Sequence, residues 1–146
     1  MTTPASWRTA DEQGYLIRML QGEVARPAAL DLLGSQITAV DAQAGTLQAT
    51  YLATDRFLNP AGTVQGGLLG AMLDDLTASM VDATVLAGQG VATLSLNVSF
   101  LRPALPGPLQ GSARVLRRGR DICHVEGELR QGGKTVASAV AVCKVV

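Results

Sequence analysis

The longest helical pattern in the chain runs from Gly66 to Leu86. Its large apolar residues recur at intervals of three and four positions, which places them on one broad face of a helix. These residues are Leu68, Leu69, Met72, Leu73, Leu76 and Met80. Gly88 and Gly90 then end the pattern. A helix with such an apolar face must pack against a second layer of the domain.

Six strand-like segments flank this helix in the sequence, two before it and four after it. We expect strands over residues 36–40, 46–53, 91–101, 109–117, 122–130 and 134–145. In the third of these segments, Leu94 and the other apolar residues at even positions alternate with Thr93 and the other polar residues at odd positions. The element order predicts an α+β fold in which an antiparallel sheet of about six strands wraps around the long helix.

A short amphipathic helix is expected near the N-terminus, from about residue 10 to residue 21. The run from Thr9 to Glu12 has the form of a capping box, with Thr9 as the N-cap and Glu12 reaching back to it. Apolar residues follow at helical spacing, and Gly22 and Pro27 then break the pattern. We expect this helix to have only a packing role.

The length of 146 residues fits one domain over residues 1–146. With 47% hydrophobic and 16% charged residues, disorder is not expected. Lys plus Arg equals Asp plus Glu, at 12 each, so nucleic acid and anionic membranes are not expected partners. No apolar run reaches the roughly 18 residues of a membrane span, and residues 1–8 lack the apolar core of a signal peptide. We therefore predict a cytoplasmic protein.

Neither the cysteines nor the histidine suggest a metal site. Cys123 and Cys143 lie in strand-like segments without a CxxC pair, and we interpret them as buried free thiols. The sole histidine, His124, has no second ligand at metal-site spacing beyond its neighbour Cys123. We expect neither a metal ion nor a cofactor.

A second face of the long helix combines small residues with a single charge. Gly67, Gly70 and Ala71 lie there together with Asp74. Small residues let a ligand or another chain segment approach closely, and a carboxylate in such a place is difficult to explain as a solvated surface charge. Asp74 is either favoured by the helix dipole or functional, whereas Asp75 falls on a polar stripe where the dipole is explanation enough.

The helix opens with Gln65, Gly66 and Gly67. Backbone N–H groups at a helix N-terminus can hold an oxygen that gains negative charge, although a double glycine by itself is usually turn chemistry. The carboxylate of Asp74 comes about two turns later. We expect this reach to suit a thioester carbonyl bound at the tip of the helix.

Taken together, these residues resemble a known family. The segment Asn59-Pro-Ala-Gly-Thr-Val-Gln65-Gly66-Gly67, followed by Met72-Leu-Asp74-Asp75, is similar to the phenylacetate-degradation (PaaI-like) type of acyl-CoA thioesterase in the hotdog superfamily. The motif of that family has an Asn, a Gly, then His-Gly-Gly, and a carboxylate nine residues after the His. The similarity continues to the C-terminus, and it covers the N-terminal part by element order only.

The resemblance implies hydrolysis of an acyl-CoA thioester to a free acid and CoA. Asp74 would be the general base or the nucleophile, and the N–H of Gly66, next to Gly67 at the substrate-binding tip, would polarise the carbonyl oxygen. Asn59 would orient the substrate or the water. The sites of the family lie at a dimer interface, so the chain would form a homodimer or homotetramer, and Thr93 would hold the water from the partner subunit.

The chain departs from the family motif at Gln65, where the typical member has His. Glutamine donates and accepts hydrogen bonds but does not transfer protons at neutral pH. Arg117, Arg118 and Arg120 form a basic turn that could bind the phosphates of CoA, or could simply be solvated.

Two other functions stay open. A non-catalytic acyl-CoA or acyl-ligand binding protein would explain Gln65, although it has little need for Asp74. A hotdog dehydratase or hydratase needs an acid–base pair at the site, and His124 lies on a late strand. Neither the acyl group nor the choice between dimer and tetramer follows from the sequence.

Overall fold

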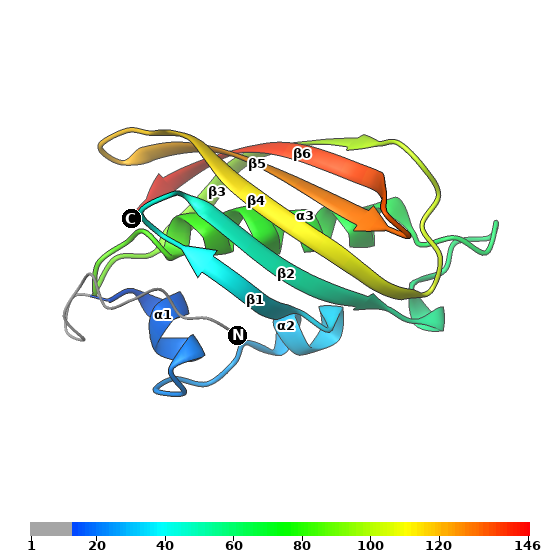
Figure 1. The fold of residues 1–146 in the computed structure, drawn as a ribbon, viewed down its shortest axis with the longest axis horizontal. Coiled ribbons are helices and arrows are strands. Elements are labelled where there is room, and N and C mark those ends of the chain that lie inside the picture. The colour runs from blue at the N-terminus through cyan, green and yellow to red at the C-terminus, as the bar shows by residue number, and fades with distance from the viewer. Residues whose placement is uncertain (1–12) are drawn as a thin grey trace.

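The computed structural model describes residues 13–146. Figure 1 shows the long helix lying across one face of a curved sheet. The elements are α1 (Tyr15–Leu20), α2 (Ala28–Leu33), β1 (Gln36–Asp41), β2 (Thr46–Ala53), the 3-10 helix η2 (Asp55–Phe57), α3 (Gly66–Asp82), β3 (Val91–Phe100), β4 (Gly107–Arg118), β5 (Ile122–Gln131) and β6 (Lys134–Val145). This arrangement confirms the predicted hotdog fold, with strand ends within two residues of the expected ones.

All six strands form one sheet in the order β1-β2-β4-β5-β6-β3, and every neighbouring pair is antiparallel. β2 and β3, the strands before and after α3 in the sequence, therefore lie towards opposite edges of the sheet. β1 and β3 are its two edges. An exposed edge strand offers unpaired backbone groups to another chain.

The helix α3 packs closely on the middle of the sheet because two strands carry glycine there. A Cβ atom on Gly111 of β4 would lie 3.2 Å from Leu76, and one on Gly127 of β5 would lie 3.1 Å from Thr77. The apolar face expected from the sequence is buried, except for the partly buried Leu68. The helix ends at Asp82, four residues earlier than its apolar pattern suggests.

The N-terminal part holds two short helices. In α1, Leu16, Ile17 and Met19 are buried, as a packing role requires. The expected capping box at residues 9–12 lies outside the described residues. The sequence pattern does not predict α2, because six residues are too few to show a helical period. Gly34 ends α2 in the left-handed region, at a φ of 61°.

The strand β3 does not alternate as strictly as its sequence suggests. Its pairing with β6 shifts register between Thr93 and Ser95, so Leu94 is the extra residue of a β-bulge. Leu96 and Val98 pack on the core, and the bulge brings Thr93 to their side of the sheet. The expectation that Thr93 shares a face with Ser95 is therefore wrong, because one extra residue inverts the alternation.

Candidate functional site

The loop that leads into α3 is shaped by the side chain of Asn59. Its Oδ1 accepts hydrogen bonds from the backbone N–H groups of Ala61, at 3.0 Å, and Thr63, at 3.1 Å. Its Nδ2 donates to Oγ1 of Thr63 at 2.9 Å. The motif asparagine thus closes the turn before the helix, and its contact with a substrate or a water stays a prediction.

The N-terminus of α3 presents free backbone donors. Gln65 is the N-cap, its side chain is exposed and makes no capping hydrogen bond, and its own N–H donates to the carbonyl of Phe57 at 2.8 Å. The N–H groups of Gly66 and Gly67 have no acceptor among residues 13–146. Such unpaired donors at the positive end of a helix dipole form an anion-binding arrangement.

The glycines at this end of the helix have different structural reasons. A Cβ atom on Gly66 would lie 3.1 Å from the ring of Phe100, so a larger residue there would need this exposed ring to shift slightly. A Cβ atom on Gly67 or Gly70 would meet nothing within 4 Å. Because these two glycines have no side chains, the helix surface lies close to the backbone here, and this low surface leaves room for a ligand or a second chain.

A hollow of about 340 Å³ lies beside the tip of the helix. Asn59, Gly66, Leu69, Phe100 and Arg102 are among the residues that line it. It therefore combines the free N–H of Gly66 with an apolar wall. The guanidinium of Arg102 is tied to the carbonyl of Thr135, at 2.8 Å.

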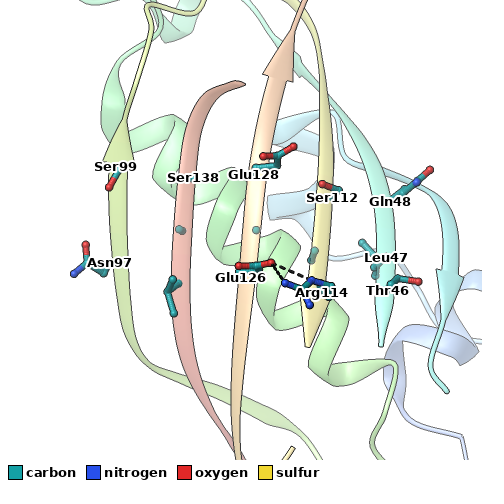
Figure 2. Close-up of a pocket in the computed structure, with 14 residues that line it drawn as sticks. Thr46, Leu47, Gln48, Asn97, Ser99, Ser112, Arg114, Glu126, Glu128 and Ser138 are labelled. Carbon is teal, nitrogen blue, oxygen red and sulfur yellow. Dashed lines mark hydrogen bonds and ion pairs between the residues drawn. The ribbon is translucent and has the colours of Figure 1, made fainter. Parts of the chain in front are cut away.

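A larger hollow, of about 620 Å³, lies on the outer face of the sheet (Figure 2). It is lined by polar side chains that include the ion pair of Arg114 with Glu126, and α3 lies behind it. None of the residues that the sequence singled out lines this hollow. We therefore place the candidate site on the helix side of the sheet, and not at the larger hollow.

Asp74 is exposed in the single chain and points towards β3. Thr93 donates a hydrogen bond from Oγ1 to Oδ1 of Asp74 at 2.8 Å, within one chain. Two expectations are corrected here. Asp74 is solvated unless a second chain covers it, and the Thr93 that contacts it does not come from a partner subunit, because the bulge in β3 turns Thr93 towards α3 of its own chain.

Asp75 occupies the buried environment that the sequence pattern assigned to its neighbour. Its Oδ2 accepts hydrogen bonds from Oη of Tyr51, at 2.7 Å, and from Oγ of Ser35, at 3.2 Å. Burial raises the pKa of Asp75, and the two hydroxyl donors oppose that shift. Burial, and next the charge of Asp75, hold the pKa of Tyr51 well above its usual range. The interpretation of Asp75 as a surface residue favoured by the helix dipole is therefore wrong.

Sequence reasoning missed Tyr51 and Ser35 entirely. Tyr51 occupies an inward position of β2, where an aromatic residue is ordinary, and Ser35 lies in the short connection between α2 and β1. The only available signal was the pair of adjacent aspartates on a largely buried helix.

One chain does not bring the two halves of the motif together. Gly66 and Asp74 are eight residues apart on α3, which corresponds to about 12 Å along the helix axis. A carbonyl oxygen bound at the N–H of Gly66 is therefore out of reach of Asp74 in the same chain. The expected reach from the helix tip to the carboxylate is wrong within one chain, since catalytic contact needs about 3 Å.

The basic turn lies far from the helix tip. Arg117, Arg118 and Arg120 are exposed at the β4–β5 turn. Figure 1 shows this turn at the opposite end of the sheet from the start of α3. Within one chain, these arginines and Gly66 do not form a common site.

The cysteines have no sign of reactivity. Cys123 of β5 and Cys143 of β6 lie opposite each other in neighbouring strands, and both are free, buried thiols. Burial raises the pKa of both thiols. This confirms them as buried free thiols. Among residues 13–146, no group of three or more His, Cys, Asp and Glu residues is arranged to hold a metal ion.

Comparisons with known proteins agree with the fold described above. A candidate esterase of Saccharolobus solfataricus is 30% identical over 87 residues, which are 59% of this chain and 61% of that protein. The chain thus spans about three fifths of the length of this relative. A candidate thioesterase of Ralstonia eutropha JMP134, described as related to phenylacetic acid degradation, has a crystal structure with a TM-score of 0.88 and 58% identity, covering 89% of this chain and 98% of that chain.

The fold also matches a protein of Bacillus halodurans whose crystal structure contains CoA. The TM-score is 0.76, with 22% identity over 88% of this chain and 84% of that chain. The family described as the acyl-CoA thioesterase N-terminal domain matches residues 54–144, from the end of β2 through almost all of β6. With the six-stranded sheet, the central helix and this match over most of its length, the chain belongs to the acyl-CoA thioesterase family of the hotdog fold.

Proposed function

We propose that this protein hydrolyses an acyl-CoA thioester to a free acid and CoA, at a site shared by two copies of the chain. The observation that carries this proposal is the hydrogen bond from Thr93 to Asp74, which holds an exposed carboxylate in one direction on the helix of a thioesterase-family chain. Supporting it is the pair of free N–H groups at the tip of the same helix.

Asp74 promotes attack on the carbonyl carbon of the thioester in one of two ways. As a general base it takes a proton from a water that attacks the thioester, and the CoA thiolate then leaves and is protonated. As a nucleophile it forms a mixed anhydride with release of CoA, and a water then hydrolyses the anhydride. In both routes, the N–H of Gly66 stabilises the oxygen that becomes negative. Gln65, exposed beside it, contributes hydrogen bonds and no proton transfer.

The second copy supplies the missing half of the site. The edge strand β3 exposes Leu94 and Phe100, each 57% accessible, beside the low surface at Gly67 and Gly70. Pairing two β3 strands about a twofold axis runs the two α3 helices in opposite directions. Asp74 would then lie near the tip of the partner's helix, and the basic β4–β5 turn would lie at the same end as that tip.

A complementation experiment tests both the activity and the sharing. Gly66→Pro removes the N–H at a helix position that tolerates proline, and Gly66→Ala adds a Cβ atom against Phe100 without removing the N–H. We expect Gly66→Pro and Asp74→Asn to be inactive alone against acetyl-, hexanoyl- and benzoyl-CoA, and Gly66→Ala to keep measurable activity.

Co-refolding the two inactive variants in equal amounts should restore roughly a quarter of wild-type activity. Half of the dimers would then be mixed, and each mixed dimer would have one intact site of two. A site confined to one chain predicts no recovery, because every chain then carries a lesion in its own site. Light scattering on the wild-type protein checks the oligomer, and a stable monomer at micromolar concentration contradicts the shared site.

A second function is favoured by Gln65 alone. Because glutamine replaces the motif histidine and has no side-chain partner at the helix cap, the chain could hold an acyl-CoA without hydrolysing it. Tight binding of acetyl-, hexanoyl- or benzoyl-CoA by calorimetry, together with no thiol release, would establish this function in place of hydrolysis.

Among the described residues, no helix is long and apolar enough to cross a membrane, and the cytoplasmic location stays a prediction.

A further inference from the structure

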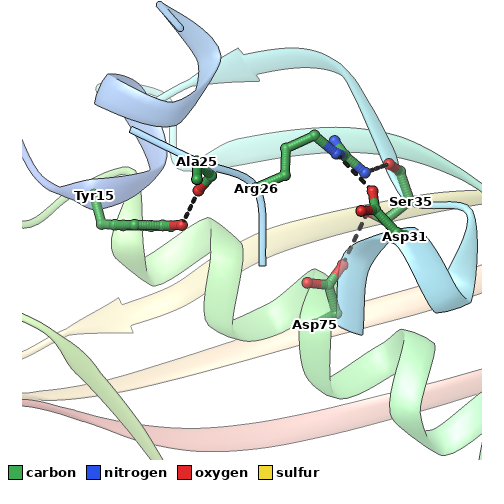
Figure 3. A network of polar contacts seen from close by, with 6 residues as sticks. All are labelled: Tyr15, Ala25, Arg26, Asp31, Ser35 and Asp75. Carbon is green, nitrogen blue, oxygen red and sulfur yellow. Dashed lines mark hydrogen bonds and ion pairs between the residues drawn. The ribbon is translucent and has the colours of Figure 1, made fainter. Parts of the chain in front are cut away.

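A polar network, buried at Tyr51 and Ser35 and exposed at Arg26 and Asp31, joins α3 to the N-terminal part of the chain. Asp75 accepts from Tyr51 of β2 and from Ser35, as described above. Figure 3 shows that Ser35 is held in turn by Arg26, whose Nη2 donates to the carbonyl of Ser35 at 2.7 Å. The same guanidinium pairs with Asp31 of α2 at 3.0 Å. The network thus runs from α2 to the middle of α3.

The network and the Thr93 contact hold α3 from two sides. Neighbouring residues on a helix point about 100° apart. Asp75 is therefore fixed towards β2 while Asp74 is fixed towards β3. These strands are separated in the sheet by β4, β5 and β6. Any rotation of α3 that breaks one contact also displaces the other.

Apolar side chains in place of Asp75, Tyr51 and Ser35 would fill the same space with a smaller loss of solvation free energy. Tyr51 and Ser35 are almost fully buried, at 2% and 1% accessible, and burying a carboxylate between them is unfavourable unless hydrogen bonds compensate. The hydrogen bonds, unlike apolar contacts, depend on direction, so they favour one rotation of α3 about its axis. Apolar contacts alone permit small rotations that would re-aim Asp74.

We propose that Asp75 is a positioning residue, held by Tyr51 and Ser35, that sets the rotation of α3 and thereby aims the carboxylate of Asp74 at Thr93. This inference rests on the proposed function, because it assigns Asp75 to the chemistry through the reactive Asp74. Asp75 itself does not touch the substrate.

Steady-state kinetics on the network variants provides the first test, with the fastest of acetyl-, hexanoyl- and benzoyl-CoA as substrate. Tyr51→Phe removes only the hydroxyl, and we expect kcat to fall roughly 10-fold while KM stays within about twofold, because misplacing a catalytic group costs rate and not binding. Asp75→Ala should have a similar or larger effect. Asp75→Asn keeps an acceptor oxygen and should recover kcat to within about threefold of wild type.

A double-mutant cycle separates positioning from stability. If Tyr51 acts through the contact of Asp74 with Thr93, then adding Tyr51→Phe to Thr93→Ala should lower kcat little further, because the contact is already lost. Multiplying effects on kcat would overturn the proposal. Glu126→Gln, on the outer face of the sheet, is the matched control and should leave kcat unchanged.

A measurement independent of turnover keeps the proposal testable if the proposed function fails. The methyl signal of Thr93 reports on its contact with Asp74, and Asp74→Ala, which removes the acceptor oxygen, gives the reference for a lost contact. We expect Tyr51→Phe to move this signal towards that reference and Glu126→Gln to leave it in place. If Tyr51→Phe does not fold, Ser35→Ala serves in its place. A Thr93 signal unmoved in a folded network variant overturns the positioning role, whether or not the wild type hydrolyses acyl-CoA.

Discussion

Asp74 and Asp75 are adjacent on α3 but belong to different environments. Asp74 is exposed and accepts a hydrogen bond from Thr93, whereas Asp75 is largely buried and accepts from Tyr51 and Ser35. The helical rotation of about 100° between neighbours makes this division unavoidable. Only one of the two carboxylates can face a substrate, and the single chain assigns that place to Asp74.

The two aspartates should therefore respond differently to the same substitution. We expect Asp74→Asn to lower kcat by at least roughly 10²-fold, the usual cost of losing a general base or nucleophile. Asp75→Asn keeps an acceptor for Tyr51 and should retain most of the activity. Thiol release from acyl-CoA measures both variants. Equal losses in the two variants would contradict the assignment of the chemistry to Asp74.

Gln65 should act by hydrogen bonding alone. A neutral amide does not titrate, so the wild-type pH–rate profile should rise through a single acidic limb and then stay flat. Gln65→His should add a second ionisation at about pH 6–7, the usual histidine range. Gln65→Ala should cost roughly 1–3 kcal/mol in transition-state binding. A clear neutral ionisation in the wild-type profile would show that another group carries protons.

The basic β4–β5 turn should matter only for substrates that carry phosphates. We expect Arg118→Gln and Arg120→Gln to raise KM for an acyl-CoA roughly threefold to tenfold, because each removes a charge-assisted contact with phosphate. The same acyl group on N-acetylcysteamine, which has no phosphates, should react unchanged. Arg114→Gln, on the outer sheet face, is the control. Equal effects on both thioesters would exclude a role for the turn in binding phosphates.

Asp82 should make stability depend on pH. Burial raises its pKa to about 6, against a smaller opposing contribution from the backbone of Leu16. The folded state therefore binds this proton more tightly than the unfolded state, so the stability gained by protonation is complete below about pH 4 and is lost as the pH rises through 6. We expect Asp82→Asn, which imitates the protonated form, to be more stable at pH 7.5 by on the order of 1–2 kcal/mol.

Thermal unfolding at several pH values measures this effect. The Tm of Asp82→Asn should exceed that of the wild type by about 2–6 °C at pH 7.5 and converge with it below about pH 4. Glu126→Gln, which also removes one negative charge, should not show this pattern. A constant difference in Tm across the pH range would mean that Asp82 does not titrate with folding.

Some features of this protein were decided by local sequence. The apolar period from Leu69 to Met80 and the alternation within the later strands depend on which side of an element each residue occupies, and neighbouring residues suffice to set it. The spacing of Gln65, Gly66 and Asp74 along the helix is likewise local. For this reason the long helix and the six strands could be predicted, and the structure and the family match agree with that fold. The roles of the motif residues stay predictions.

Other features were decided only by the tertiary structure. A single extra residue at Leu94 turned Thr93 towards Asp74, and no alternation pattern contains that information. The burial of Asp75 depends on Tyr51 and Ser35, which lie 24 and 40 residues away along the chain. Sequence periodicity indicates which face of a helix or strand a residue occupies. The residues that this face contacts depend on how elements distant in the sequence pack together. The partners of both aspartates are long-range contacts, so only the folded chain could reveal them.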